Sequence, residues 1–182
     1  MLTGDIVLPR ADAHDRLITI VAEPLTDLER LAAQWRELEA RADAPFFLSW
    51  YWIGTWLRSI AVPITVITAY AGDRRVGLAL VAHRVVTRHR CLRVATVFLH
   101  ETGDPLEDVV TIEFNDVLAE SGWSHDVRTA VLRALSERDD IGGRRYDAAV
   151  WRGAVGDLTA SLDARGLHWR CLDTAPSAFV DL

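Results

Sequence analysis

The chain of 182 residues contains no lysine, because all 20 of its basic residues are arginines. A catalytic or Schiff-base lysine is therefore excluded. There are only two cysteines, Cys91 and Cys171, and neither lies near another thiol in the sequence. Two cysteines are too few for a disulfide framework that would stabilise the fold, so we expect both to be reduced and structural. The histidines show no metal-ligand spacing, and we expect no metal site.

Long apolar runs are also missing. The longest, residues 61–72, is interrupted by Pro63 and two threonines, whereas a membrane helix needs roughly 18 to 20 apolar residues. The first residues lack the basic start and apolar stretch of a signal peptide. The net charge of −6 argues against a nucleic-acid binder. We therefore expect a cytoplasmic protein with neither membrane nor nucleic acid as a partner.

Half of the residues are hydrophobic, which is enough for one domain with a genuine core. A weak alternation predicts a strand over 17–22, and Thr26 with Glu29 forms a capping box for a helix with an apolar stripe over 28–42. Ser49 can cap a second helix, which Pro63 ends. Three β-prone runs with short breaks then predict an antiparallel meander, at 64–70, 76–87 and 91–99.

The remaining patterns predict alternating helices and strands. We expect a short helix over 114–119, a helix over 126–137, a strand over 146–151, a helix over 157–165 and a strand over 167–172. The fold class is therefore α/β, a sandwich with a mixed, mainly antiparallel sheet and helices on both faces. His83 lies within a strand, and we expect it to be a hydrogen-bonded sheet residue.

Aromatic residues gather between Phe46 and Trp56, where six of the fifteen in the chain occur. As core residues, Trp52 and Trp56 would pack on the meander, since they lie about one helical turn apart. As site residues, Trp50 or Tyr51 would project from the start of the helix and stack on a sugar or an acyl chain. Both interpretations can hold.

Acidic residues dominate the segment 100–120, which has seven carboxylates and no arginine. His100 or Glu101, directly after the meander, could take a proton from an amine or hydroxyl; the alternative is an exposed strand-end pair. Glu113 and Asn115 could hydrogen-bond a polar acceptor; alternatively Asn115 caps a helix and Glu113 is solvated. Asp104 is a further candidate for substrate binding. The acids show no EF-hand-like spacing.

The predicted order of strand, two helices and meander is how the GNAT acyltransferase fold begins. The run Phe46-Phe-Leu-Ser-Trp50 with Trp56 resembles a segment of the CelD-type acetyltransferases of that superfamily, which are associated with the synthesis of cellulose and other polysaccharides. Further stretches resemble the same family: 102–105 through 112–115, then 118–119, and the ending 175–182. The resemblance implies two GNAT-like modules, of which residues 1–182 would be the first, and an acyl-CoA site in the second.

The resemblance also implies a place to look for a CoA cradle in this chain. The signature Q/R-x-x-G-x-G/A uses backbone N–H groups at a helix start to hold the diphosphate. The loop after Leu99 has one glycine, Gly103, among several carboxylates. A carboxylate about 5 Å from a phosphate costs on the order of 3 kcal/mol at an effective dielectric constant near 20. We therefore expect no CoA to bind at this loop.

Two glycine-containing loops could substitute for the missing signature. The run 142–145 follows a helix, so Gly142 is more simply its C-cap. Arg152, Gly153 and Gly156 lie between a strand and a helix, the correct polarity for a phosphate loop, but Asp157 would repel phosphate and could instead be an N-cap.

Three hypotheses follow. In the leading one, the chain is a module that binds no CoA, is inactive alone, shapes the acceptor site and packs on a catalytic second module, with acetyl-CoA or another acyl-CoA as co-substrate of the parent enzyme. A self-associating copy is the alternative partner. In the second, the chain is a non-catalytic module that binds another protein through its aromatic face. In the third, it is a complete acyltransferase with an atypical CoA loop at 152–156.

Overall fold

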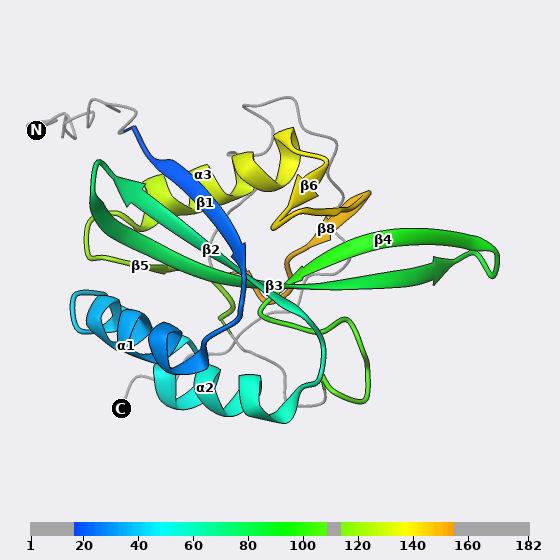
Figure 1. The fold of residues 1–182 in the computed structure, drawn as a ribbon, viewed down its shortest axis with the longest axis horizontal. Coiled ribbons are helices and arrows are strands. Elements are labelled where there is room, and N and C mark those ends of the chain that lie inside the picture. Colours follow the sequence, from blue (N-terminus) through cyan, green and yellow to red (C-terminus); the bar gives the residue numbers. More distant parts are fainter. Residues whose placement is uncertain (1–16, 109–113, 155–182) are drawn as a thin grey trace, which may run out of the picture.

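The computed structural model of the protein describes residues 17–108 and 114–154 (Figure 1). Its elements, in chain order, are β1 (Thr19–Pro24), α1 (Leu28–Glu39), the 3-10 helix η1 (Phe46–Leu48), α2 (Trp50–Ser59), β2 (Ile64–Ala71), β3 (Arg74–Arg88), β4 (Leu92–Leu99), β5 (Leu118–Ala119), α3 (Ser124–Glu137), β6 (Asp140–Ile141), β7 (Arg144–Arg145) and β8 (Ala148–Val150). The helix expected over 157–165, the strand over 167–172, Glu113 and Gly156 lie outside the described residues.

The main sheet has the order β1-β2-β3-β4-β8, and the short β5 also pairs with β3. Strands β1 to β4 are antiparallel neighbours, which confirms the predicted meander, while β8 runs parallel to β4. The sheet is therefore mixed and mainly antiparallel, as expected from the sequence. Among the described residues, no helix is long and apolar enough to cross a membrane.

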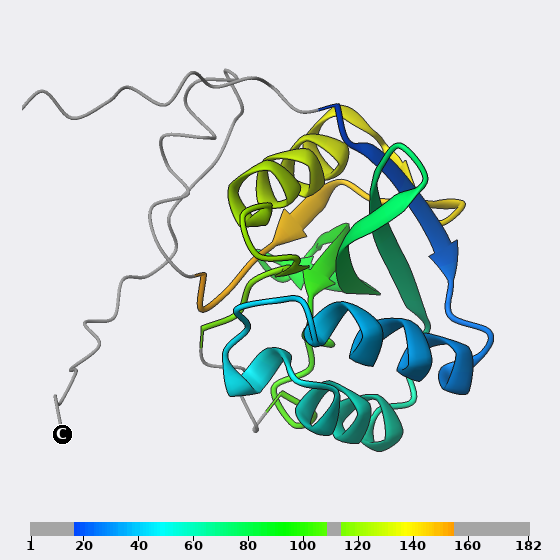
Figure 2. The same ribbon diagram turned by 90° about the vertical axis from the view of Figure 1, so that its left-hand side faces the viewer.

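Helices cover both faces of this sheet, α1 and α2 on one side and α3 on the other (Figure 2). Strand β3 contributes apolar side chains to both faces of the sheet. Leu78 and Leu80 pack in the cluster under α1 and α2, whereas Ala79 and Val81 pack in the cluster under α3. Because side chains alternate along a strand, a continuous apolar run is what a strand covered on both faces requires.

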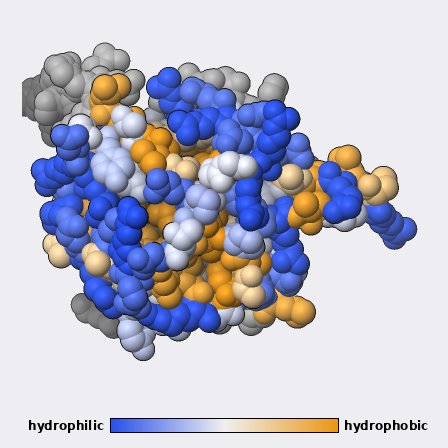
Figure 3. Space-filling model, in the orientation of Figure 1, coloured by the Kyte–Doolittle hydropathy of each residue, from blue (hydrophilic) through white to orange (hydrophobic). Residues whose placement is uncertain are grey.

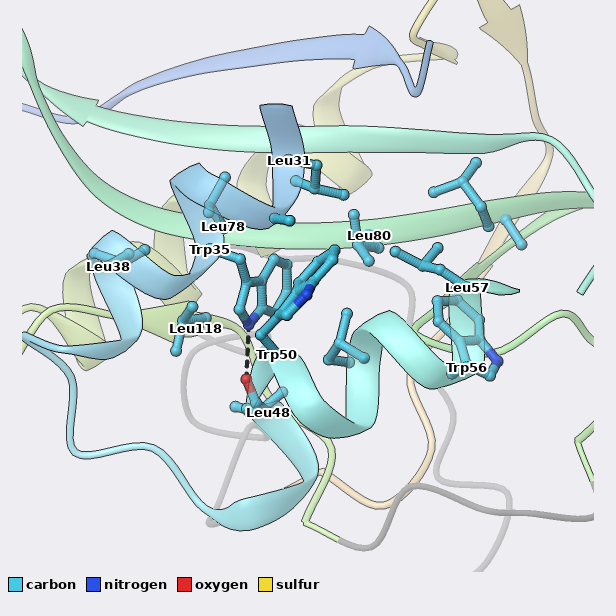
Figure 4. Close-up of a cluster of buried hydrophobic side chains, with 14 residues drawn as sticks. Leu31, Trp35, Leu38, Leu48, Trp50, Trp56, Leu57, Leu78, Leu80 and Leu118 are labelled. Carbon is cyan, nitrogen blue, oxygen red and sulfur yellow. Dashed lines mark hydrogen bonds between the residues drawn. The ribbon is translucent and has the colours of Figure 1, made fainter. Parts of the chain in front are cut away.

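The cluster under α1 and α2 is centred on Trp35, which is fully buried (Figure 4). Its indole Nε1 donates to the carbonyl oxygen of Leu48 at 2.8 Å, so the polar atom of this large ring is satisfied. Trp56 is buried in the same cluster and Trp52 packs partly buried against it. The prediction of a core residue is confirmed for Trp56, whereas Trp52 is only partly buried at the edge of the cluster.

Of the two N-caps predicted for the helices on this face, one is confirmed and one is wrong. Ser49 caps α2, its hydroxyl accepting the N–H of Trp52, as predicted. The prediction for α1 is wrong by one residue, because Asp27 and not Thr26 is the N-cap, and its carboxylate accepts the N–H of Arg30 at 2.9 Å. An aspartate is at least as good a cap as a threonine.

The expected helix over 114–119 does not form. Val117, Leu118 and Ala119 are all buried, which a single helix face cannot achieve, and β5 pairs with β3 through Leu118↔Leu78 and Ala119↔Gly77. The expected C-cap at Gly142 is also wrong, because α3 ends at Glu137 and Gly142 and Gly143 form the turn between β6 and β7 with φ of 60° and 76°. The helix and strand expected over 126–137 and 146–151 are present as α3 and β8.

Candidate functional site

The candidate site lies where the parallel strands β4 and β8 end side by side. Phe98, near the end of β4, pairs with Val150, the last residue of β8. The chain continues from β4 into His100 and Glu101 and from β8 into Trp151 and Arg152. The structure thus brings together the candidate catalytic pair and the start of the candidate phosphate loop, which are about fifty residues apart in sequence.

His100 is held inside the protein with its side chain only 1% exposed, so the alternative of an exposed strand-end pair is wrong. The N–H of Leu80 donates to its Nε2 at 3.0 Å, and its Nδ1 lies 3.0 Å from Oδ1 of Asn115. Because Nε2 accepts, the proton must sit on Nδ1 and be donated to Asn115. Burial lowers the pKa of His100 to about 4, so the ring is neutral at physiological pH.

Asn115 completes this buried network. Its side-chain Nδ2 donates to the carbonyl oxygen of Leu99 at 2.8 Å, and its backbone carbonyl oxygen accepts the indole N–H of Trp151 at 2.9 Å. Asn115 is fully buried and caps no helix, which corrects that expectation. Both polar atoms of its side chain bond to the protein, so His100 and Asn115 position the ends of β4 and β8 and do not face a ligand in this structure.

Glu101 is the titratable group best suited to proton transfer here. Its side chain is 4% exposed, and its Oε2 lies 3.4 Å from Nη1 of Arg152 without a hydrogen bond from any described residue. Burial raises the pKa of Glu101 to about 7, against the opposing charge of Arg152, with Asp108 adding to the rise. A carboxyl group that titrates near neutral pH can both take and give a proton.

Arg152 is engaged on two sides. Besides its contact with Glu101, its guanidinium lies over the ring of Phe98, 5.7 Å from the ring centroid. Gly153 follows with a φ of 62°. The guanidinium that the phosphate-loop interpretation would use is thus already paired with a carboxylate and an aromatic face.

The loop after β4 is closed on itself by carboxylates. Asp108 accepts the backbone N–H of Thr102 and that of Gly103, each at 2.8 Å, and also the hydroxyl of Thr102 at 2.9 Å. Asp104 accepts the N–H of Leu106, and this bond together with its ion pair to Arg84 at 2.6 Å lowers the pKa of Asp104. The backbone N–H groups at the start of this loop, where the sequence analysis looked for a CoA cradle, therefore already bind the carboxylate of Asp108.

Trp50 and Tyr51 belong to a different region. Trp50 is buried against Trp35, with ring centroids 6.4 Å apart, while Tyr51 is 75% exposed. They line a shallow pocket of about 480 Å³ whose other lining residues are Arg36, Glu39, Thr55 and Arg58. No contact joins Trp50 or Tyr51 to Glu101 among the described residues; Trp35 lies between the two regions, with its ring 6.4 Å from that of Trp50 and 6.0 Å from that of His100.

Two features escaped the sequence analysis. Asp108 was one acid among several, and its role as an internal ligand for backbone N–H groups carries no signal beyond its distance of five residues from Gly103. Trp35, which joins the two regions, looked like an ordinary member of an apolar stripe. His83 is as expected, since its Nε2 lies 3.2 Å from the hydroxyl of Thr65. No three His, Cys, Asp or Glu side chains of the described residues are grouped to hold a metal ion.

Of the comparisons with known proteins, only the one with solved structures found similar chains. No protein-family model and no curated protein matches the chain. An aminoglycoside acetyltransferase from an uncultured soil metagenomic sample, solved with sisomicin, is 12% identical, with a TM-score of 0.43, over 92% of this chain and 98% of that one. A probable acetyltransferase is 13% identical, with a TM-score of 0.40, over 90% and 98% of the two chains. Values this low transfer no activity to the chain.

Proposed function

We propose that this chain is the N-terminal module of an acyl-CoA-dependent acyltransferase of the CelD type, that it binds no CoA itself, and that it shapes the acceptor site beside a catalytic second module. The observation that carries this proposal is the carboxylate of Asp108 on the N–H groups of Thr102 and Gly103. The order of strand, two helices and meander, as the structure has it, supports the relation to acyltransferases.

The closed loop argues against CoA binding in two ways. A diphosphate would have to displace Asp108 from three hydrogen bonds, and it would approach the carboxylates of Asp104 and Glu107 as well. Hydrogen bonds to a charged acceptor contribute about 1.5–3 kcal/mol each. The displacement therefore opposes binding before any charge repulsion is considered.

Glu101 is the residue that we assign to acceptor activation. In the transfer, the acceptor oxygen or nitrogen forms a bond to the thioester carbonyl carbon, the carbon–sulfur bond breaks, and the acceptor's proton passes to Glu101. The CoA thiolate leaves with the sulfur electrons and is protonated from solvent. His100 cannot take this role in the observed arrangement, because both of its ring nitrogens are hydrogen-bonded within the protein.

Isothermal titration of the chain with acetyl-CoA tests the proposal. We expect no saturable heat from the wild-type chain. Saturable binding at micromolar concentration would overturn it, and an Arg152→Ala variant would then show whether the loop after β8 is the site, as the single-module hypothesis requires. Arg152 is the suitable probe because it is the only basic residue of that loop and its side chain is half exposed.

The open reading frame beyond codon 182 tests the second module. We expect it to encode a segment with the motif Q/R-x-x-G-x-G/A. In the protein that contains both modules, Glu101→Gln should lower the transfer rate by about two orders of magnitude or more, the usual contribution of a general base. Unchanged turnover in this variant would contradict the assigned role of Glu101.

A specific observation also favours the second hypothesis, a protein-binding module. The rings of Phe46, Phe47, Tyr51 and Trp52 form a cluster with centroid separations of 4.8–6.1 Å, in which Phe46 and Tyr51 are exposed. Exposed apolar clusters mark interaction sites. Under this hypothesis Phe46→Ser with Tyr51→Ser would abolish partner binding, whereas Glu101→Gln would change nothing, so the same two variants separate the two functions.

A further inference from the structure

The hairpin of β3 and β4 extends beyond the rest of the sheet as a two-stranded arm (Figure 1). We define the arm as residues 84–94. Strand β2 pairs with β3 only as far as Ala82, and β8 pairs with β4 only from Thr96. Both edges of the arm therefore leave backbone groups without a strand partner among the described residues. Open edges of this kind are sites where another chain can dock.

Apolar side chains lie on both faces of the arm. The cross-strand pairs Val86↔Val94 and Arg88↔Leu92 share one face, and Val85 lies on the other. Leu92 is 56% exposed, and Val85 is exposed as well. Figure 3 shows hydrophobic and hydrophilic residues interleaved on the projecting part of the molecule. Since an isolated ribbon is marginally stable in water, a ribbon that is partly apolar on two faces fits a protein partner that covers it.

The arm carries positive charge alone. It contains Arg84, Arg88, Arg90 and Arg93, and the surrounding stretch 74–100 has no aspartate or glutamate. With four arginines and no acid in the arm, the net charge of −6 for the whole chain leaves −10 for the rest. Within residues 17–108 and 114–154, Arg88, Arg90 and Arg93 form no ion pair. The tip of the arm, residues 88–93, thus presents cations that no described carboxylate neutralises. Their charge is opposite in sign to the net charge of the rest of the chain.

The complementary surface lies at the base of the same arm. The acidic loop, residues 103–108, is tied there by the ion pair between Arg84 and Asp104. It contains the carboxylates of Asp104, Glu107 and Asp108; Asp104 pairs with Arg84, and Asp108 accepts three hydrogen bonds within the loop. Leu106, in the middle of the loop, is 87% exposed. The tip of the arm is basic, and the loop at its root is acidic. The tip of one copy is therefore complementary in charge to the loop of a second copy. Two antiparallel arms related by a two-fold axis would bring each tip, with Leu92, toward the acidic loop and Leu106 of the other copy.

We propose that two copies of this chain associate through their β3–β4 arms, tip to acidic loop, in a symmetric pair. The inference is independent of the proposed acyltransferase role. Ionic contacts at an exposed surface weaken as salt screens them, so the pair should dissociate more readily at high ionic strength. The exposed thiol of Cys91 at the tip provides a position for a fluorescent label.

Sedimentation velocity over a concentration series at low salt tests the proposal. We expect the wild-type chain to reach twice the chain mass, and we expect Arg88→Glu with Arg93→Glu to raise the dissociation constant about tenfold or more. The matched control is Arg30→Glu with Arg138→Glu, which makes the same change in net charge at exposed positions outside the arm. It should behave as the wild type does.

A second pair of variants examines the acidic loop without touching the arm. Leu106→Arg should weaken association, because it places a cation opposite the basic tip, whereas Leu17→Arg, at a side chain of similar exposure (89%), should not. Circular dichroism checks that each variant is folded. If the wild-type chain is monomeric at every concentration, the proposal is overturned. The arm would then bind a different, acidic protein. Association that persists equally in the arm and loop variants overturns it too.

Discussion

Replacing Glu101 by glutamine should change how the stability of the protein depends on pH. Burial raises the pKa of this carboxyl from 4.5 to about 7. In the unfolded chain Glu101 loses its proton near the lower value, and in the folded chain near the higher one. Between these two values the folded state binds more protons, so stability is fully present below pH 4.5 and is lost as pH rises through 7.

The size of the effect follows from the separation of the two titrations. Each pH unit between them is worth about 1.4 kcal/mol, so ionisation of Glu101 costs the fold on the order of 3 kcal/mol by about pH 8. The attraction of Arg152, whose side chain is 52% exposed, is screened by water and does not remove this cost. Glutamine has nearly the same shape and cannot ionise, so the variant escapes the loss.

Urea denaturation at about pH 4 and about pH 8 measures the difference. We expect the Glu101→Gln variant and the wild type to have similar free energies of unfolding at the lower pH, and the variant to be more stable by up to about 3 kcal/mol at the higher pH. Glu23→Gln, at an exposed position of β1, is the matched control and should parallel the wild type. Parallel pH profiles for all three proteins would refute the reasoning.

Three further expectations concern Gly103, His100 and Trp35. Gly103→Ala should lower the free energy of unfolding by about 2–4 kcal/mol, because φ is +73° and a Cβ would lie 2.4 Å from the ring of Phe98, whereas Gly122→Ala, with a φ of +78° and open space, should cost about 1 kcal/mol in the same urea titration. NMR of the imidazole of His100 should show the neutral form with the proton on Nδ1 at about pH 6, and an imidazolium signal there would contradict the buried network. Trp35→Phe should cost about 2–4 kcal/mol, since it leaves a buried carbonyl without its donor and opens a cavity; a loss below 1 kcal/mol would contradict this.

The layered fold was largely predictable because its signals are local. The alternation of Leu78, Ala79, Leu80 and Val81 already places apolar residues on both faces of a strand, and the capping position of Ser49 marks the start of α2. Where local signals were ambiguous, the predictions failed. Leu118 and its neighbours read as a short helix, and pairing with β3 decided otherwise.

The candidate site was predictable in its residue types and not in their roles. The sequence by itself determined that a histidine and a glutamate follow the third meander strand and that no CoA signature stands there. Only the tertiary structure decided that Leu80 and Asn115 enclose His100, that Arg152 meets Glu101, and that Asp108 fills the loop. The physical reason is that burial, and with it the pKa of each group, depends on segments that meet through packing and are distant along the chain.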